Sequence, residues 1–179
     1  MTIQAQALVY ATAAHKGQFR SNGKTEFIWH PIQVACLVKS YGYNSDEVVA
    51  GAYLHDTVED TEETYERIHF AFGKKIADIV QECSNPVADN HEDRHYKNST
   101  NAAHLAAALN RETFLIKCCD RIANLRDISF IYNKSWFKSF TARTEEYLLP
   151  VLKKALYGEP MLDDLIVQVE FNKEVIKHL

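Results

Sequence analysis

One short segment of the chain, YLHDTVEDT at residues 53–61, concentrates groups that can bind a cation or accept a proton. It continues the apolar segment VVAGAYL and holds His55 with the carboxylates of Asp56, Glu59 and Asp60. In a helix, residues three and four positions apart share a face, so these groups would crowd into one sector. They repel one another unless a cation or hydrogen-bond donors compensate them. A divalent metal ion is the simplest compensation, and a solvated acidic helix end is the alternative.

A metal site would need further ligands from distant parts of the chain, and two positions qualify. His30 directly precedes Pro31, which lies where a first helical residue belongs. Asp120 lies in an apolar stretch, where an unpaired carboxylate would be costly to bury. Each position also has a structural interpretation: His30 as a loop histidine bonded to backbone, and Asp120 as the ion-pair partner of Arg121 or Arg126. The four candidates together favour a metal site.

The composition is that of a globular protein, and we expect one domain over residues 1–179. A chain of this length buries a sizeable core without disulfides. The net charge of −4 does not favour nucleic acid as a partner. No apolar run approaches the ~18 residues typical of a membrane span. The N-terminus lacks the basic region of a signal peptide, so we expect a cytoplasmic protein.

The four cysteines show neither CxxC spacing nor a regular framework. They are Cys36, Cys83, Cys118 and Cys119. In apolar settings such as these, cysteine behaves as a small hydrophobic residue. We therefore expect all four to be reduced and most of them to be buried, as is usual in a cytoplasmic protein.

Helical periodicity covers nearly the whole chain and predicts an all-α fold. Pro150 lies inside one predicted helix, so we expect a kink or break near Leu148–Leu149. The Asn22–Gly23 turn leaves room for one short hairpin near 18–29, the only strand structure that we expect. The predicted helices cover residues 3–16, 31–42, 64–73, 74–84, 102–110, 112–129, 135–157 and 160–178. A further predicted helix begins at residue 45 and continues into the segment at 53–61.

A polar stretch at residues 84–101 contains a proline and shows no helical period, which predicts a mobile loop. A loop of this length is often functional. Its basic and imidazole groups could contact an anion, although a solvated loop is the alternative. These groups are His91, Arg94, His95 and Lys97.

Three motifs together resemble those of the HD-domain phosphohydrolases. They are HP at 30–31, HDTVEDT at 55–61 and DRIANLRD at 120–127. Within that family, the sequence is most similar to the hydrolase domain of the RelA/SpoT family and to the single-domain small alarmone hydrolases. Residues 10–31 resemble that family's N-terminal helix, arginine-bearing loop and histidine. The resemblance covers roughly residues 5–130 and implies a helical HD-domain bundle.

The resemblance implies the metal ligands and the catalytic groups. The ligands would be His30, His55, Asp56 and Asp120, a set of two imidazoles and two carboxylates. Such a set suits Mn²⁺, with Zn²⁺ and Mg²⁺ as alternatives. The acidic pair of the family falls on Glu59 and Asp60. We expect Glu59 to be the general base that accepts a proton from the attacking water, and Asp60 to orient that water or to bind the metal.

Substrate contacts are implied at five positions, and two of them depart from the family pattern. Arg20 matches the loop arginine, which a phosphate or a base plane could engage. Ser21 replaces a residue that is often basic, and Lys24 could supply the missing charge. Asn124 matches an asparagine that contacts the nucleoside. Asp127 replaces a small hydroxyl residue.

The leading hypothesis is hydrolysis of the 3′-pyrophosphate of guanosine tetra- or pentaphosphate, which yields GDP or GTP and pyrophosphate. A second hypothesis keeps the fold and the metal but assigns another nucleotide, such as a nucleoside monophosphate or the 2′-phosphate of NADPH. A third is a nucleotide-binding sensor without turnover. The oligomeric state is left open by the sequence.

Overall fold

The structure is a computed structural model that describes residues 1–86, 93–131 and 134–179. The all-α prediction is confirmed: over these residues every regular element is helical. In chain order the elements are α1 (Ile3–Ala14), α2 (Trp29–Ser40), α3 (Asp46–Leu54), α4 (Thr57–Asp60), α5 (Tyr65–Phe72), α6 (Lys74–Cys83), α7 (Arg94–Ala106), α8 (Arg111–Ile131), α9 (Lys134–Arg143), the π-helix η1 (Thr144–Leu148), α10 (Leu149–Ala155) and α11 (Pro160–Lys177).

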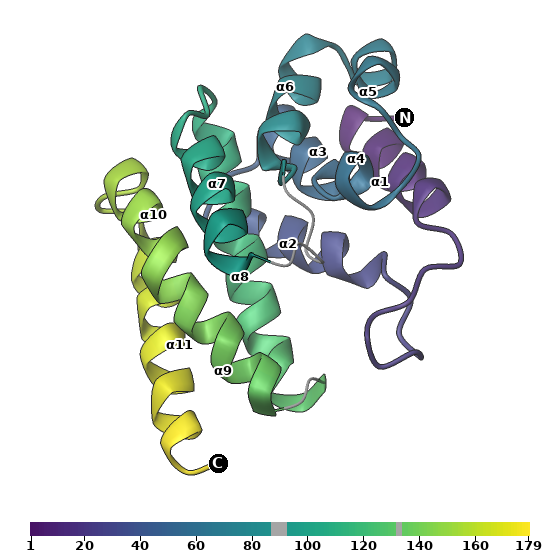
Figure 1. Ribbon diagram of the computed structural model, residues 1–179. Coiled ribbons are helices and arrows are strands. Elements are labelled where there is room, and N and C mark those ends of the chain that lie inside the picture. The colour runs from purple at the N-terminus through teal and green to yellow at the C-terminus, as the bar shows by residue number, and fades with distance from the viewer. Residues whose placement is uncertain (87–92, 132–133) are drawn as a thin grey trace.

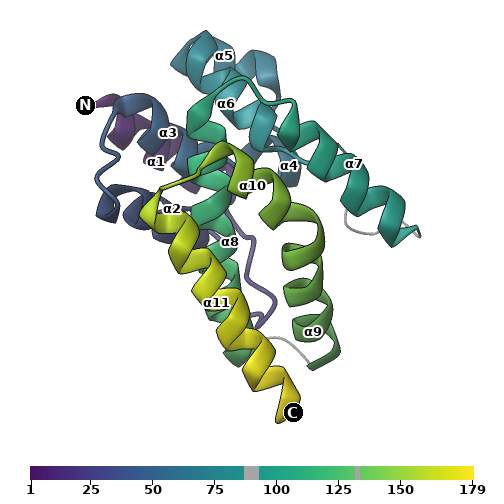
Figure 2. The same cartoon turned by 90° about the vertical axis from the view of Figure 1, so that its left-hand side faces the viewer.

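The long helix α8 is the central element of the bundle. It contacts α2, α3 and α6 on one side and α9, α10 and α11 on another (Figures 1 and 2). The chain begins beside α5 and ends at the far end of α11 (Figure 1). Segments that are distant in sequence therefore meet along α8.

The apolar side chains form two clusters, and α3 contributes to both. Val48, Val49 and Ala52 pack into the larger cluster, which extends through α8 to α11. Ala50 and Leu54 pack into the smaller cluster with α1, α5 and α6. Because α3 is buried on nearly all sides, its C-terminal end is held firmly in place.

The segment at residues 53–61 spans the end of α3 and the whole of α4. Ser45 caps the start of α3 as predicted, with its side chain accepting from Val48 N, and α3 ends at Leu54. Thr57 Oγ1 then donates to the Leu54 carbonyl over 2.6 Å, which satisfies a backbone group that α3 leaves free. His55 keeps helical backbone angles between α3 and α4. The break therefore barely changes the direction in which the segment presents its side chains.

The predicted kink before Pro150 takes the form of a π-turn. Proline lacks an N–H, and in a regular helix its ring would collide with the carbonyl of residue 146. The chain widens there: the Leu149 N–H donates to the carbonyl of Thr144, five residues earlier. The helix predicted over 135–157 is thus divided into α9, η1 and α10.

The loop predicted for residues 84–101 is wrong in its second half, which belongs to α7. Asp93 caps this helix by accepting from the Tyr96 N–H over 2.9 Å. Its buried residues are Lys97 and Leu105. Because the residues at 94–101 that face inward are mostly polar, the sequence there shows no helical period of apolar residues. The first half of the predicted loop, with His91, lies largely outside the described residues.

Of the remaining expectations, the one for the hairpin is confirmed in part and the one for the cysteines is confirmed. The predicted hairpin is reduced to an isolated antiparallel bridge between Phe19 and Glu26. All four cysteines are free, and Cys36 is the exposed one. No helix over the described residues has the length and apolar character needed to cross a membrane.

Gly51, one turn before His55, is the place where α3 approaches its neighbours. A Cβ atom there would lie 2.9 Å from Ile79 Cγ2 of α6 and 3.0 Å from Ile116 Cδ1 of α8. Glycine in a helix costs about 0.5–1 kcal/mol relative to alanine. At this position the close approach of the three helices requires it.

We predict that Gly51→Ala destabilises the protein by about 1 kcal/mol, because overpacking costs about 1–3 kcal/mol and exceeds the gain in helix propensity. Urea unfolding measures the change. Ile116→Val removes the Cδ1 atom, so the double variant should lose less than the sum of the two single variants. Strict additivity, or a stabilised Gly51→Ala protein, would contradict the close packing.

Candidate active site

The four predicted metal ligands meet at the junction of α2, α3, α4 and α8. His30 Nε2 lies 3.0 Å from Asp120 Oδ1 and 3.6 Å from Asp56 Oδ2. His55 Nε2 lies 3.1 Å from Asp56 Oδ1 and 3.9 Å from Asp120 Oδ1. One ligand atom from each of His30, His55 and Asp56 lies within 4.8 Å of the others. Three distant parts of the chain thus place two imidazoles and two carboxylates around one point.

The backbone fixes the tautomer of His55. Its Nδ1 lies 2.9 Å from the Ala52 carbonyl oxygen, which can only accept a hydrogen bond, so Nδ1 carries the proton. In the neutral ring, Nε2 is then the lone-pair atom, and it faces the carboxylates. This atom is buried, and in the neutral ring its lone pair meets no donor, because the groups that face it are carboxylate oxygens. Such a donor set fits a divalent cation.

The electrostatics of the cluster favour a positive charge between the carboxylates. Burial lowers the pKa of His55, but Asp56 and Asp120 outweigh it and raise that pKa to about 10. Burial raises the pKa of Asp56, but His55 lowers it to about 2. Burial likewise opposes ionisation of Asp120, yet its bonds to His30 and His55 and the charge of Lys117 hold its pKa well below the usual range. Both carboxylates therefore remain ionised.

Two side chains of α8 itself hold Asp120. Asn124, one turn later, donates from Nδ2 to Asp120 Oδ1 over 2.6 Å. Lys117, one turn earlier, places Nζ 3.7 Å from Asp120 Oδ2. Burial lowers the pKa of Lys117, but Asp120 and the other acidic groups nearby raise it above the usual value. Asp120 is thus oriented from both sides.

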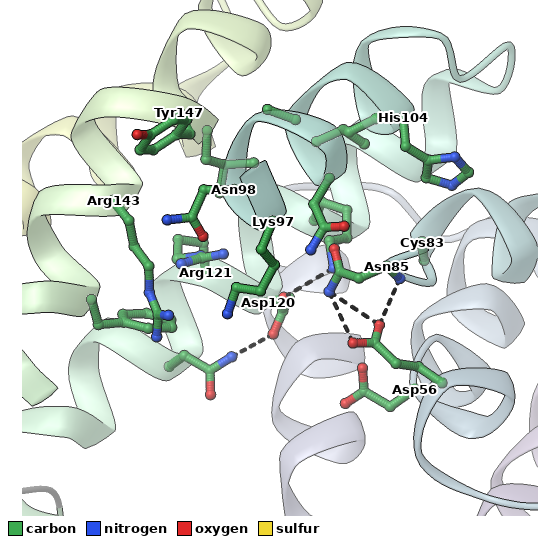
Figure 3. Close-up of a pocket in the computed structure, with 18 of the residues that line it drawn as sticks. Asp56, Cys83, Asn85, Lys97, Asn98, His104, Asp120, Arg121, Arg143 and Tyr147 are labelled. Atoms are coloured by element: carbon green, nitrogen blue, oxygen red, sulfur yellow. Dashed lines mark hydrogen bonds and ion pairs between the residues drawn. The ribbon is translucent and has the colours of Figure 1, made fainter. Parts of the chain in front are cut away.

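The cluster lies at a cavity of about 250 Å³ that carries both signs of charge. Figure 3 shows Asp56 at one side, Arg121 and Arg143 at the other, and Lys97 and Asp120 between them. A cation site and an array of basic groups thus share one cavity, which suits a polyanionic ligand. The basic lining residues are Arg20, Lys97, Lys117, Arg121 and Arg143.

The predicted catalytic pair also reaches this cavity. Glu59 and Asp60 line it together with Asn85. The Asn85 backbone N–H donates to Glu59 Oε2 over 2.8 Å, and Asn85 Nδ2 lies 2.9 Å from Oε1. Asn85 thereby holds the Glu59 carboxylate in one orientation, with lone pairs left over for a further donor. The Asp60 backbone carbonyl accepts from Gln18 over 2.7 Å, which ties the end of α4 to the N-terminal loop.

The five predicted substrate contacts are divided between the cavity and its surroundings. Arg20 and Asn124 line the cavity. Asp127 lies behind them, with Oδ2 3.3 Å from Arg20 Nη2. Ser21 and Lys24 are exposed in the turn of the N-terminal loop and are not among the lining residues. Their contact with a substrate therefore remains a prediction.

Most of the five basic lining residues, together called the basic wall, were not expected from the sequence. Lys117 stands out in retrospect as a charge within the apolar run FLIKCC, where only an ion pair makes burial tolerable. Arg121 appeared there only as a partner for Asp120; its guanidinium lies 4.2 Å from the centre of the Phe140 ring. Arg143 carried no signal at all. Lys97 was noted as a possible anion contact, and it does line the cavity.

Comparison with known proteins decides the family. A family model described as the HD domain matches residues 7–136. The chain belongs to the HD-domain family. One relative is the guanosine-3′,5′-bis(diphosphate) 3′-pyrophosphohydrolase MESH1 of Xenopus tropicalis. The two sequences are 33% identical over 144 residues, which cover 79% of this chain and 76% of that protein. This HD-domain protein is therefore a homologue of MESH1.

Two further comparisons extend the relationship. The bifunctional (p)ppGpp synthase/hydrolase SpoT of Escherichia coli K12 is 34% identical over 125 residues, which are 69% of this chain but 18% of SpoT. The HD-domain protein thus spans about a fifth of SpoT. A solved structure of a metazoan SpoT ortholog, described as hydrolysing ppGpp, has a TM-score of 0.79 at 22% identity and covers 94% of this chain and 96% of its own. The last likeness confirms the fold.

We predict that His55→Gln weakens Mn²⁺ binding by more than about 100-fold, because the variant loses a ligand atom and not merely an outer-shell partner. Titration calorimetry on chelator-treated protein measures the affinity, and the Mn²⁺-dependent rise of the unfolding midpoint should vanish with it. His69→Gln makes the same change at an exposed position of α5 and should bind as the unaltered protein does. Equal affinity of both variants would exclude His55 as a ligand.

Proposed function

We propose that this HD phosphohydrolase removes the 3′-pyrophosphate of guanosine tetra- or pentaphosphate and releases GDP or GTP with pyrophosphate. The observation that carries the proposal is that His30, Asp56 and Asp120 of the His/Asp cluster line one cavity together with five basic side chains. Identity of about a third with MESH1 supports the choice of substrate. A nucleotide with two pyrophosphate groups needs both a cation and several basic partners.

The proposed ligands are His30, His55, Asp56 and Asp120, and the ion that suits them best is Mn²⁺. When bound, a divalent ion polarises a phosphoryl oxygen and lowers the pKa of water. Glu59 is the proposed general base, held by Asn85 so that its free lone pairs face the cavity. Asp60 lies beside it and would orient the attacking water.

The basic wall would hold the substrate during the reaction. Lys97 and Lys117 are 3% and 7% exposed, so their charges act in a poorly solvated space where an anion interacts strongly. Arg121 and Arg143 both lie over the Phe140 ring, which limits their motion. Held in this way, basic groups fix the phosphates without a large loss of side-chain entropy.

A second candidate, release of orthophosphate from another nucleotide, is favoured by one observation. Arg20, the loop arginine expected to bind a phosphate, already donates to Asn124 and Asp127. With Ser21 as its neighbour, the loop presents less positive charge to a substrate than the family pattern implies. The same cavity would then receive a nucleotide with fewer phosphates.

We predict that Mn²⁺-loaded protein releases pyrophosphate from guanosine tetraphosphate. Nucleotide chromatography with separate assays for pyrophosphate and orthophosphate distinguishes the candidates, and NADPH and nucleoside monophosphates complete the panel. Orthophosphate from one of these nucleotides would support the second candidate. Tight nucleotide binding without any product, in Mn²⁺, Mg²⁺ and Zn²⁺ alike, would favour the third hypothesis, a nucleotide-binding sensor without turnover.

We predict that Glu59→Gln lowers kcat by about 10²–10⁴-fold, the usual contribution of a general base, while Mn²⁺ affinity stays within about two-fold. The matched control is Glu62→Gln, an exposed carboxylate of the same segment that does not line the cavity. Full activity of Glu59→Gln would transfer the role of the base to Asp60.

We predict that Asn85→Ala lowers kcat by about ten-fold, because misplacement of a catalytic group is costly even when the group is present. The loss should disappear in a Glu59→Gln background, since Asn85 would act only through Glu59. Steady-state kinetics of the two single variants and the double variant measure this coupling. An undiminished ten-fold effect in that background would mean that Asn85 contacts the substrate itself.

A further inference from the structure

A continuous series of hydrogen bonds joins the N-terminal loop to the candidate metal centre. Arg20 Nη2 donates to Asp127 Oδ2 over 3.3 Å and to Asn124 Oδ1 over 3.1 Å. Asn124 Nδ2 donates in turn to Asp120 Oδ1 over 2.6 Å. His30 Nε2 lies 3.0 Å from that same oxygen. The series therefore ends on the carboxylate that faces both histidines.

The chemistry of the two neighbours allows Asn124 only one orientation. A guanidinium has no acceptor, so the amide oxygen must face Arg20. An ionised carboxylate has no donor, so the amide nitrogen must face Asp120. Rotation of the amide by 180° would break both bonds and bring like partners together. Arg20 thus holds the Asn124 amide in the orientation that Asp120 also requires.

Arg20 is itself held on three sides. It is 7% exposed, although it lies in a polar loop. Asp127 balances its charge, and its guanidinium carbon lies 5.9 Å from the centre of the Phe27 ring. The two hydrogens of Nη2 have one acceptor each, in Asn124 and Asp127. An arginine fixed in this way cannot swing toward a ligand without breaking bonds that already exist.

We propose that Arg20 is a positioning residue of the metal centre: held by Asp127, it orients Asn124, and Asn124 orients the Asp120 carboxylate toward the two histidines. Asp127 completes the series because without it the guanidinium is free to turn toward the cavity. The role concerns the metal centre alone and is independent of which nucleotide is the substrate. A failure of the proposed activity would leave it intact and testable.

The direction in which metal affinity changes when Arg20 is removed separates this positioning role from a purely electrostatic role and from a substrate contact. If Arg20 acted only through its charge, its removal would strengthen the binding of a cation nearby. If it contacted only the substrate, its removal would raise KM and leave metal affinity unchanged. A positioning role alone predicts weaker metal binding in the absence of any nucleotide.

The experiment is a titration of chelator-treated protein with Mn²⁺, without nucleotide. Arg20→Met keeps an unbranched side chain but removes the guanidinium, and should weaken Mn²⁺ binding by about ten-fold, as loss of an outer-shell partner does. Arg20→Lys keeps the charge, but the lysine side chain ends one atom before the position of Nη2. It should therefore recover little of the lost Mn²⁺ affinity. Arg126→Met, at an exposed arginine of α8, is the charge-matched control and should bind Mn²⁺ unchanged or slightly more tightly.

Two further variants keep the proposal open to refutation if Arg20→Met folds poorly. Asn124→Ala carries no change of charge and should weaken Mn²⁺ binding at least as much as Arg20→Met. In the Asn124→Ala background, Arg20→Met should cause no further weakening, because the link to Asp120 is already lost. Unfolding in the presence of a chelator verifies that each variant is folded. Unchanged or tighter binding by Arg20→Met or Asn124→Ala, or additive losses in the double variant, would overturn the proposal.

Discussion

The bundle is arranged around negative charge that is buried at one point. Asp56 and Asp120 lie beside two imidazoles at the meeting place of α2, α3, α4 and α8. Ionised groups are costly to bury unless each is paired and hydrogen-bonded. Without a cation, His55 takes up the charge, which is why its pKa rises to about 10 despite its complete burial. The site is therefore a place that the surrounding protein keeps ready for a positive ion.

The surrounding elements hold these side chains through hydrogen bonds to the atoms that would not bind a cation. The Ala52 carbonyl accepts a hydrogen bond from His55 Nδ1, and Asn124 Nδ2 donates one to Asp120 Oδ1. Thr57 closes the end of α3, so that His55 and Asp56 follow in nearly helical geometry. Each of these contacts orients a side chain before any ligand arrives. This is the condition under which electrostatic interactions contribute most to binding and catalysis.

Sequence reasoning reached the parts of the structure that local chemistry decides. Ser45 as a cap, Pro150 as the cause of a kink and the gathering of His30, His55, Asp56 and Asp120 all depend on residue type and motif. It missed residues 94–101 of α7, because that part of the helix turns a polar face toward a polar cavity and lacks the apolar period that reveals most helices. It found the end of α7 within the helix predicted over 102–110, although α7 stops at Ala106. It missed Arg143 because nothing near that residue in sequence indicates that α9 lies beside α8.

The helical repeat explains why the proposed metal ligand and several of the proposed substrate contacts occur together on α8. Positions 117, 120, 121, 124 and 127 are separated by three, one, three and three residues, so they follow one side of the helix. That side carries, in order, Lys117, Asp120, Arg121, Asn124 and Asp127. Basic side chains that line the cavity, the proposed metal ligand Asp120 and the amide that bonds to it thus share one rigid element. Because α8 is packed on several sides by other helices, a shift of any one group along it would require a shift of all. The spacing between the metal centre and the basic wall is therefore set by the helix itself, and the loops are left to adjust what enters the cavity.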